Sequence, residues 1–133
     1  MSDEARLTIQ RDGDIIAARQ EGRDLAAQAG FKGSDLTIIA TAISEIARNI
    51  IVFAQQGEVS LRVIEKAGKR GVLIVAEDRG PGIADIEQAM RDGFSTGKSL
   101  GLGLPGAKRL MDEFEIVSQL GKGTTITMRK WTR

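Results

Sequence analysis

The segment VLIVAEDRGPG, residues 72–82, decides how the chain is organised, because an apolar run gives way here to a glycine-rich one. The five apolar residues 72–76 predict a buried central strand. Asp78 follows almost at once, with Gly80 and Gly82 behind it. A carboxylate at the end of a buried strand is costly unless it is paired. Taken alone, a D-x-G-x-G pattern is more often a turn; the alternative is the start of a binding site.

Strands and helices are predicted on both sides of this junction. The patterns predict strands at 7–10, 59–65, 72–76, 114–119 and 124–130, and helices at 14–29, from 34 to about 56, near 85, and at 105–114. The strands come in adjacent pairs instead of singly between helices. This order favours an α+β two-layer sandwich, in which a mixed β-sheet carries its helices on one face. The length predicts a single domain over residues 1–133.

Composition excludes several classes of function. Lys and Arg number 19 and Asp and Glu 18, so no basic excess suggests a nucleic-acid partner. Cysteine and histidine are absent, which excludes disulfides, histidine-based triads and Cys or His metal sites. We see no apolar run of about 18 residues and no signal-peptide pattern. We therefore expect a cytoplasmic protein with no membrane span.

Glu45 and Asn49 stand four positions apart on the long amphipathic helix, and so share one face of it. They flank the apolar stripe that contains Ile46 and Ile50. Each alone is most simply a solvated polar residue at the rim. Together they have a chemical use: the Asn carbonyl is a hard ligand for magnesium beside phosphate oxygens, and the Glu can orient or deprotonate a nucleophile.

Two glycine-rich patterns follow the junction. Residues 93–99, GFSTGKS, approach a Walker A loop but have only three residues between the glycines where four are needed. Residues 101–106, GLGLPG, match G-x-G-x-x-G but follow a polar loop instead of a strand, which argues against a dinucleotide fingerprint. Both retain one property: glycines leading into a helix present free N–H groups to an anion. The alternative is a loop that needs glycine only for tight turns.

Four elements in this order resemble the sequence boxes of the GHKL ATP-binding family, which includes ATPase domains of gyrase, heat-shock chaperones, histidine kinases and MutL. They are Glu45 with Asn49, the D-x-G-x-G at 78–82, a lid ending in G-x-G-x-x-G, and GKGT at 121–124, which by itself is a hairpin turn. The resemblance spans about residues 7–128. It implies the Bergerat ATP-binding fold, with ATP and Mg²⁺ as cofactors.

The resemblance also implies a role for the residues at the adenine and magnesium positions. Asn49 would ligate magnesium, and Glu45 would be the catalytic base. Asp78 would hold the adenine amine, since its acceptor oxygens suit an exocyclic amine and repel the O6 of guanine. Gly80 and Gly82 would let the backbone pass flat against the ring.

The remaining implied contacts are to the triphosphate and its surroundings. Gly101, Gly103 and Gly106 would line the triphosphate, and Thr124 would support the adenine end. The resemblance assigns no role to Lys98, which has two equal interpretations: it contacts the terminal phosphate, or it is merely a solvated lid residue. The lid itself is expected at about 83–100.

Within the family, residues 45–50 and 92–114 resemble the small stand-alone serine/threonine kinases of bacterial partner switching. Other branches append further domains, or a helical pair with a target His, and we expect neither here. Such kinases phosphorylate STAS-domain proteins of the stressosome and, once released, activate a serine phosphatase. We therefore expect these two partners, and neither nucleic acid nor membrane.

Two alternatives stay open. One is an anti-sigma factor of the same fold, which holds a sigma factor and phosphorylates its antagonist. The other is an ATP-gated binding module with little chemistry. The presence of Glu45 argues against the second alternative, since binding needs Asn49 and the glycines but no base.

Overall fold

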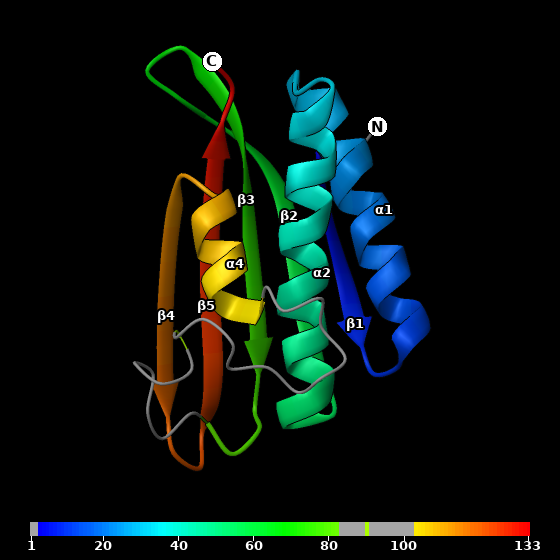
Figure 1. Cartoon of the computed structure of the whole chain (residues 1–133), viewed down its shortest axis with the longest axis vertical. Coiled ribbons are helices and arrows are strands. Elements are labelled where there is room, and N and C mark those ends of the chain that lie inside the picture. The colour runs from blue at the N-terminus through cyan, green and yellow to red at the C-terminus, as the bar shows by residue number, and fades with distance from the viewer. Residues whose placement is uncertain (1–2, 83–89, 91–102) are drawn as a thin grey trace.

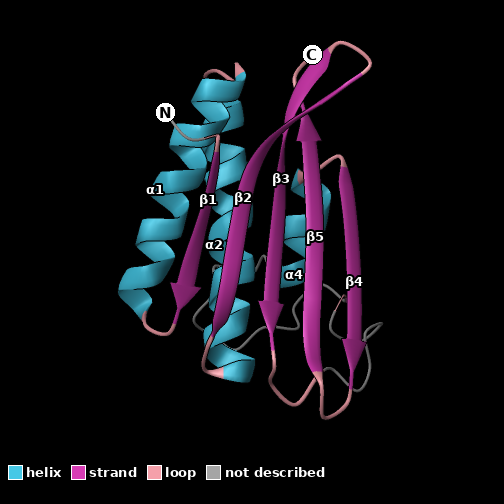
Figure 2. Ribbon diagram, turned by 180° about the vertical axis from the view of Figure 1, so that it is seen from behind, coloured by secondary structure: helices cyan, strands magenta, loops and turns pink. Residues whose placement is uncertain are grey.

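The computed structural model describes residues 3–82, 90 and 103–133. Five strands form one sheet in the order β1-β2-β3-β5-β4. The three described helices cover one face of this sheet (Figure 1), and the opposite face carries none of them (Figure 2). In chain order the elements are β1 (Glu4–Ile9), α1 (Asp12–Ala29), α2 (Ser34–Ala54), β2 (Gly57–Lys66), β3 (Lys69–Asp78), α4 (Gly103–Leu110), β4 (Glu113–Gln119) and β5 (Gly123–Trp131).

The two-layer α+β sandwich is confirmed, but the expected mixed sheet is wrong, because all four ladders are antiparallel. The connection from β1 to β2 contains two helices, so β2 runs back along β1. The connection from β3 to β4 does return the chain in the direction of β3. However, β5 lies between these two strands and is antiparallel to both. The parallel pair therefore shares no hydrogen bonds.

Helix α2 is the centre of the helical layer, with α1 on one flank and α4 on the other (Figure 1). Ile39, Ile43, Ile46 and Ile50 recur at helical spacing and are all buried. By length and composition alone, α2 could cross a membrane. Because its apolar stripe belongs to the core of this fold, we interpret α2 as a core helix.

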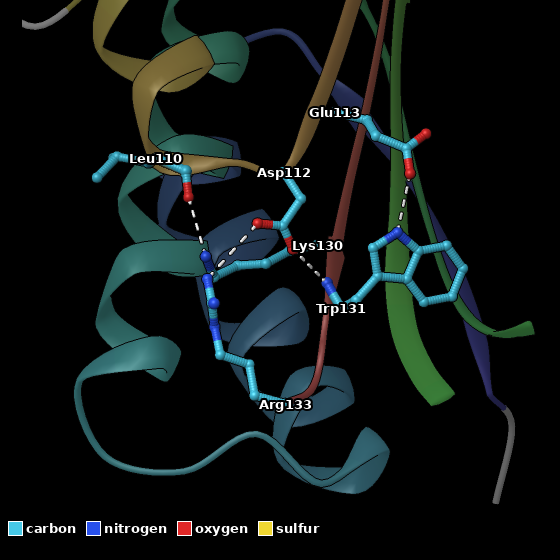
Figure 3. A network of polar contacts seen from close by, with 6 residues as sticks. All are labelled: Leu110, Asp112, Glu113, Lys130, Trp131 and Arg133. Carbon is cyan, nitrogen blue, oxygen red and sulfur yellow. Dashed lines mark hydrogen bonds and ion pairs between the residues drawn. The ribbon is translucent and has the colours of Figure 1, made fainter. Parts of the chain in front are cut away.

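Polar contacts join the end of α4 to β5 (Figure 3). The buried Lys130 donates from Nζ to the carbonyl oxygen of Leu110, the last residue of α4, at 3.1 Å. Asp112 accepts from the backbone N–H of Trp131 at 2.8 Å, and Glu113 accepts from its indole Nε1 at 2.9 Å. A cation is favourable at the free carbonyls of a helix end. These bonds fix the C-terminal end of α4 on the sheet.

This network also accounts for one wrong element boundary. The helix expected at 105–114 ends at Leu110, and Phe114 already belongs to β4. The backbone N–H of Asp112 donates to the carbonyl oxygen of Arg129 in β5. The chain therefore joins the sheet two residues after the helix ends. The short helix expected near residue 85 lies outside the described residues.

Candidate functional site

The elements that carry the described site residues meet at one end of the molecule, the lower end in Figure 1. Strand β3 ends there with Asp78, and β5 begins with Gly123. Helix α2 ends there too, after carrying Glu45 and Asn49 in its C-terminal half. Helix α4 packs beside α2. The fold therefore brings segments about 80 residues apart in sequence to one region.

Asp78 is held in one orientation by the backbone around it. Its Oδ1 atom accepts from the N–H of Gly80 at 2.9 Å and from the N–H of Thr124 at 3.2 Å. Thr124 is also its partner in the β3–β5 ladder. No described residue donates to Oδ2. The half-buried carboxylate thus presents one oxygen as a free acceptor, which is what recognition of an exocyclic amine requires.

Two glycines missed as site residues let neighbouring strands approach Asp78. A Cβ on Gly123 would overlap the Asp78 carbonyl oxygen, and φ at Gly123 is +115°. A Cβ on Gly57 would overlap the Glu77 carbonyl oxygen and lie 3.1 Å from the Asp78 Cβ. The sequence suggested only the end of a helix near residue 56 and a hairpin turn at 121–124. Their larger role depends on strand register, which local patterns do not reveal.

Gly80 and Gly82 are explained first by protein packing. A Cβ on Gly80 would meet Ala54 at the end of α2. Gly82 has φ +80°, and a Cβ there would overlap the carbonyl oxygen of Gln119. Both glycines thus allow the loop after β3 to pack between α2 and the β4–β5 turn. Their predicted contact with an adenine ring stays a prediction.

Thr124 is buried, with 5% exposure, and its side chain points to protein. Its Oγ1 atom lies 2.8 Å from the Oγ of Ser118, its partner across the β4–β5 ladder. Its backbone N–H, as described above, holds Asp78. Thr124 is therefore a positioning residue in this structure. Ser118 was missed, although counting outward from the turn at 121 pairs 118 with 124.

Glu45 and Asn49 differ from these residues because their side-chain polar groups form no hydrogen bond with any described residue. Glu45 is only 6% exposed and Asn49 is half-buried. Neither makes a hydrogen bond or ion pair with a described residue. Glu45 is buried as a whole residue, but its carboxylate oxygens are not among the fully buried atoms without a partner, so they stay accessible. The pair is therefore available to a ligand.

These residues fit a magnesium ion that is bound mainly through its nucleotide. Among the described residues, no group of three or more acidic side chains could hold a metal. Magnesium in nucleotide sites usually takes one or two protein oxygens and completes its shell with phosphate and water. Asn49 can supply one such oxygen.

The predicted triphosphate segment is described only in part. Gly103 opens α4 with φ +55°, and Gly106 is buried within this helix. Gly101, Lys98 and the expected lid at 83–100 lie outside the described residues. What the structure places is helix α4 itself, which packs against α2. The phosphate contacts themselves stay predictions.

Comparison with known proteins agrees with this architecture. A family model, the histidine kinase-like ATPase domain, matches residues 10–130. The chain is 50% identical over 133 residues to serine/threonine-protein kinase RsbT of Bacillus subtilis (strain 168), and the match covers 100% of both chains. It is 36% identical over 111 residues to an anti-sigma F factor of Thermoanaerobacter sp. (strain X514), which covers 80% of this chain and 77% of the relative.

A solved structure shares the fold. The RsbU and RsbW domains of Rv1364c from Mycobacterium tuberculosis match with a TM-score of 0.65 and 22% identity, over 96% of this chain and 31% of that one. At this identity the likeness concerns the fold alone. The predicted family and its ATP-binding fold are confirmed by the family model and the relatives. This chain belongs to the histidine kinase-like ATPase family.

Proposed function

We propose that the chain is an ATP-dependent serine/threonine-protein kinase of a bacterial partner-switching pathway. Its substrates are STAS-domain proteins of a stressosome, and its second partner, once it is released, is a serine phosphatase that it activates. The observation that carries this proposal is full-length identity of 50% to a serine/threonine-protein kinase, RsbT of Bacillus subtilis. The unpaired Glu45 beside Asn49 supports catalysis over mere binding.

Adenine recognition falls to Asp78. Its Oδ1 atom is occupied by two backbone donors, so Oδ2 accepts from the exocyclic amine of adenine. The O6 of guanine at the same place would face a carboxylate oxygen, acceptor against acceptor. This arrangement selects ATP over GTP.

The triphosphate extends from the adenine end toward α2 and the start of α4. Asn49 would hold magnesium through its carbonyl oxygen, and the ion, when bound, neutralises charge on the phosphates. Gly101, Gly103, Gly106 and Lys98 would contact the phosphate chain. The positive end of the α4 dipole favours the same charge.

Phosphoryl transfer requires a positioned acceptor hydroxyl and a group that takes its proton. The hydroxyl oxygen of the substrate Ser or Thr attacks the γ-phosphorus, and the bond from that phosphorus to the β–γ bridging oxygen breaks. The carboxylate of Glu45 takes the hydroxyl proton. ADP leaves, and the substrate carries a phosphate ester.

A second candidate function, an anti-sigma factor kinase, is favoured by the 36% identity to an anti-sigma F factor. It predicts the same chemistry with a different sequestered partner. Both functions place the protein in the cytoplasm, as the sequence predicts.

Incubation of the purified chain with γ-labelled ATP, magnesium and a STAS-domain protein of the same organism tests the proposal. We expect the label on a Ser or Thr of that protein. No transfer to any STAS-domain protein would leave an ATP-gated binding module. A pull-down then separates the two kinases: a serine phosphatase or a sigma factor should be retained.

A further inference from the structure

Arg48 has an unexplained buried donor in the middle of the proposed catalytic segment. Its Nε atom is buried and has no hydrogen-bond partner; no other buried side-chain nitrogen or oxygen in the described residues is left this way. The guanidinium makes no ion pair with a described residue. Because a buried N–H without an acceptor costs free energy, an orphan of this kind calls for an explanation.

Helical spacing shows which side of α2 carries Arg48. Thr37, Thr41, Ser44 and Arg48 follow one another at intervals of three or four and so form one stripe. Thr37 accepts from Arg23 of α1. This stripe therefore borders the side of α2 that faces α1.

Asn49 lies on the other side of the helix. It is about 100° from Arg48 around the axis, and Glu45 lies between them, about 60° from Arg48 and about 40° from Asn49. The buried Ile43 marks the sheet-facing stripe, and Arg48 and Asn49 lie on opposite sides of it. Figure 1 places α4 on the flank of α2 opposite α1. Across α2 from α4 to α1, the order is therefore Asn49, Glu45, Arg48.

This order gives Arg48 a place in the reaction, on the basis of the proposed function. Nucleotide phosphates lie on the Asn49 side, and the base Glu45 marks the acceptor hydroxyl. Arg48 lies on the side of this acceptor hydroxyl that faces away from the phosphates. A group that reaches Arg48 therefore belongs to the protein substrate that carries the hydroxyl. A guanidinium binds a carboxylate through two parallel hydrogen bonds. Nε of Arg48 is buried, whereas its two terminal nitrogens are not among the buried atoms without a partner, so a substrate carboxylate would meet these nitrogens first and reach Nε as the side chain turns outward.

We propose that Arg48 binds a carboxylate of the protein substrate next to the Ser or Thr that is phosphorylated, and so selects substrates with an acidic residue there. Arg48 is thereby a specificity-determining residue. The terminal phosphate of ATP offers similar oxygens, and the experiment is designed to separate these two sources.

The experiment compares Arg48→Gln and Arg48→Lys with the parent chain. The matched control is Arg62→Gln, which removes the same charge from an exposed position on β2. Residue 62 alternates with the buried Leu61, so it lies on the face of the sheet away from the helices. The probes are Mg-ATP alone, by calorimetry, and the STAS-domain protein that the parent phosphorylates, by steady-state kinetics.

Arg48→Gln should raise KM for the protein substrate about tenfold or more, as expected for the loss of a charged hydrogen bond, while Kd for Mg-ATP changes less than about threefold. Arg48→Lys, which keeps the charge but loses Nε, should recover part of the loss. Arg62→Gln should match the parent. Substituting the acidic residues of the substrate near its phosphorylated Ser or Thr should raise KM for the parent and have little further effect on Arg48→Gln.

Three outcomes would overturn the proposal. An equal loss of Mg-ATP affinity would assign Arg48 to the phosphate. An unchanged KM with a lowered melting temperature would make its role structural, and an unchanged KM with unchanged melting would leave it without a role. If the parent itself transfers no phosphate, the proposed function fails instead; binding of the STAS-domain protein, with and without Arg48, still tests the contact.

Discussion

The two halves of the proposed site are built in opposite ways. Around Asp78, strand backbone does the positioning: two N–H groups hold one carboxylate oxygen, and Gly57 and Gly123 let the neighbouring strands close in. Along α2, Glu45 and Asn49 have no described partner, and Arg48 keeps a buried donor unpaired.

In the proposed function, this difference separates the region around Asp78, which recognises adenine, from helix α2, which takes part in phosphoryl transfer. A carboxylate fixed by the sheet is ready before the nucleotide arrives, so binding loses little conformational entropy there. In the proposed function, the polar groups left open on α2 gain their partners only when phosphates and substrate are present. We therefore expect changes on α2 to affect transfer or magnesium dependence, and changes around Asp78 to affect ATP affinity.

Replacement of Glu45 should have the largest effect. A positioned general base is worth about 10²–10⁴-fold, so Glu45→Ala should lower transfer to a STAS-domain substrate at least about a hundredfold. Binding of Mg-ATP should stay close to normal, because Glu45 does not reach the adenine end. Glu45→Gln, which fills the same volume, controls for the cavity that alanine leaves. Transfer at the parent rate by either variant would mean that Glu45 is not the base.

Asn49→Ala should come next, through loss of the protein oxygen on magnesium. Calorimetry should measure ATP binding by each protein twice, once with magnesium and once with excess chelator. The affinity without magnesium is then the reference for the same protein. The parent should bind more tightly with magnesium, whereas the variant should show the same weak affinity in both. A magnesium effect as large as that of the parent would remove Asn49 from the metal site.

These two residues show how far the sequence could lead. The i, i+4 spacing on a strongly periodic helix placed Glu45 and Asn49 on one face, because helical geometry is local. It could not show that Glu45 is almost fully buried without a described partner, since that depends on packing between distant segments. For the same reason the antiparallel pairing of β5 with β3 was missed.

Asp78→Asn should produce a moderate loss. If the amide oxygen keeps the two backbone N–H groups, the amide nitrogen takes the place of Oδ2 and points a donor at the adenine amine. We expect ATP binding to weaken by about 1–2 kcal/mol. Glu77→Gln is the control, because it makes the same charge change at an exposed neighbouring position. Equal affinity of the parent for ATP and GTP would contradict the role of Asp78.

Thr124→Val should have the smallest effect, and it tests whether the backbone alone positions Asp78. The change removes the contact with Ser118 and keeps the backbone N–H that reaches Asp78. Chemical denaturation should show about 1 kcal/mol less stability, while ATP affinity stays the same. Thr127→Val, farther along β5, serves as the control. A clear loss of ATP affinity in Thr124→Val alone would show that the hydroxyl contributes directly.

The register around Asp78 explains the other successes and failures of the sequence. Asp78 and Thr124 were both recognised from their motifs, yet their contact spans 46 positions in the chain. Ser118 and Gly57 belong to no motif and were missed. Motifs thus identified candidate site residues, whose contacts with a ligand stay predictions, whereas the residues that support Asp78 depend on which strands pair.

The central position of β5 has a consequence for how the protein folds during its synthesis. This strand is the last of the five to be synthesised, yet it completes the middle of the sheet, between β3 and β4. Until residues 123–131 have left the ribosome, β3 lacks its second neighbour and Asp78 lacks the donor from Thr124. Pairings between distant segments also form slowly. A nascent chain should therefore acquire nucleotide binding only after residues 123–131 have emerged from the ribosome.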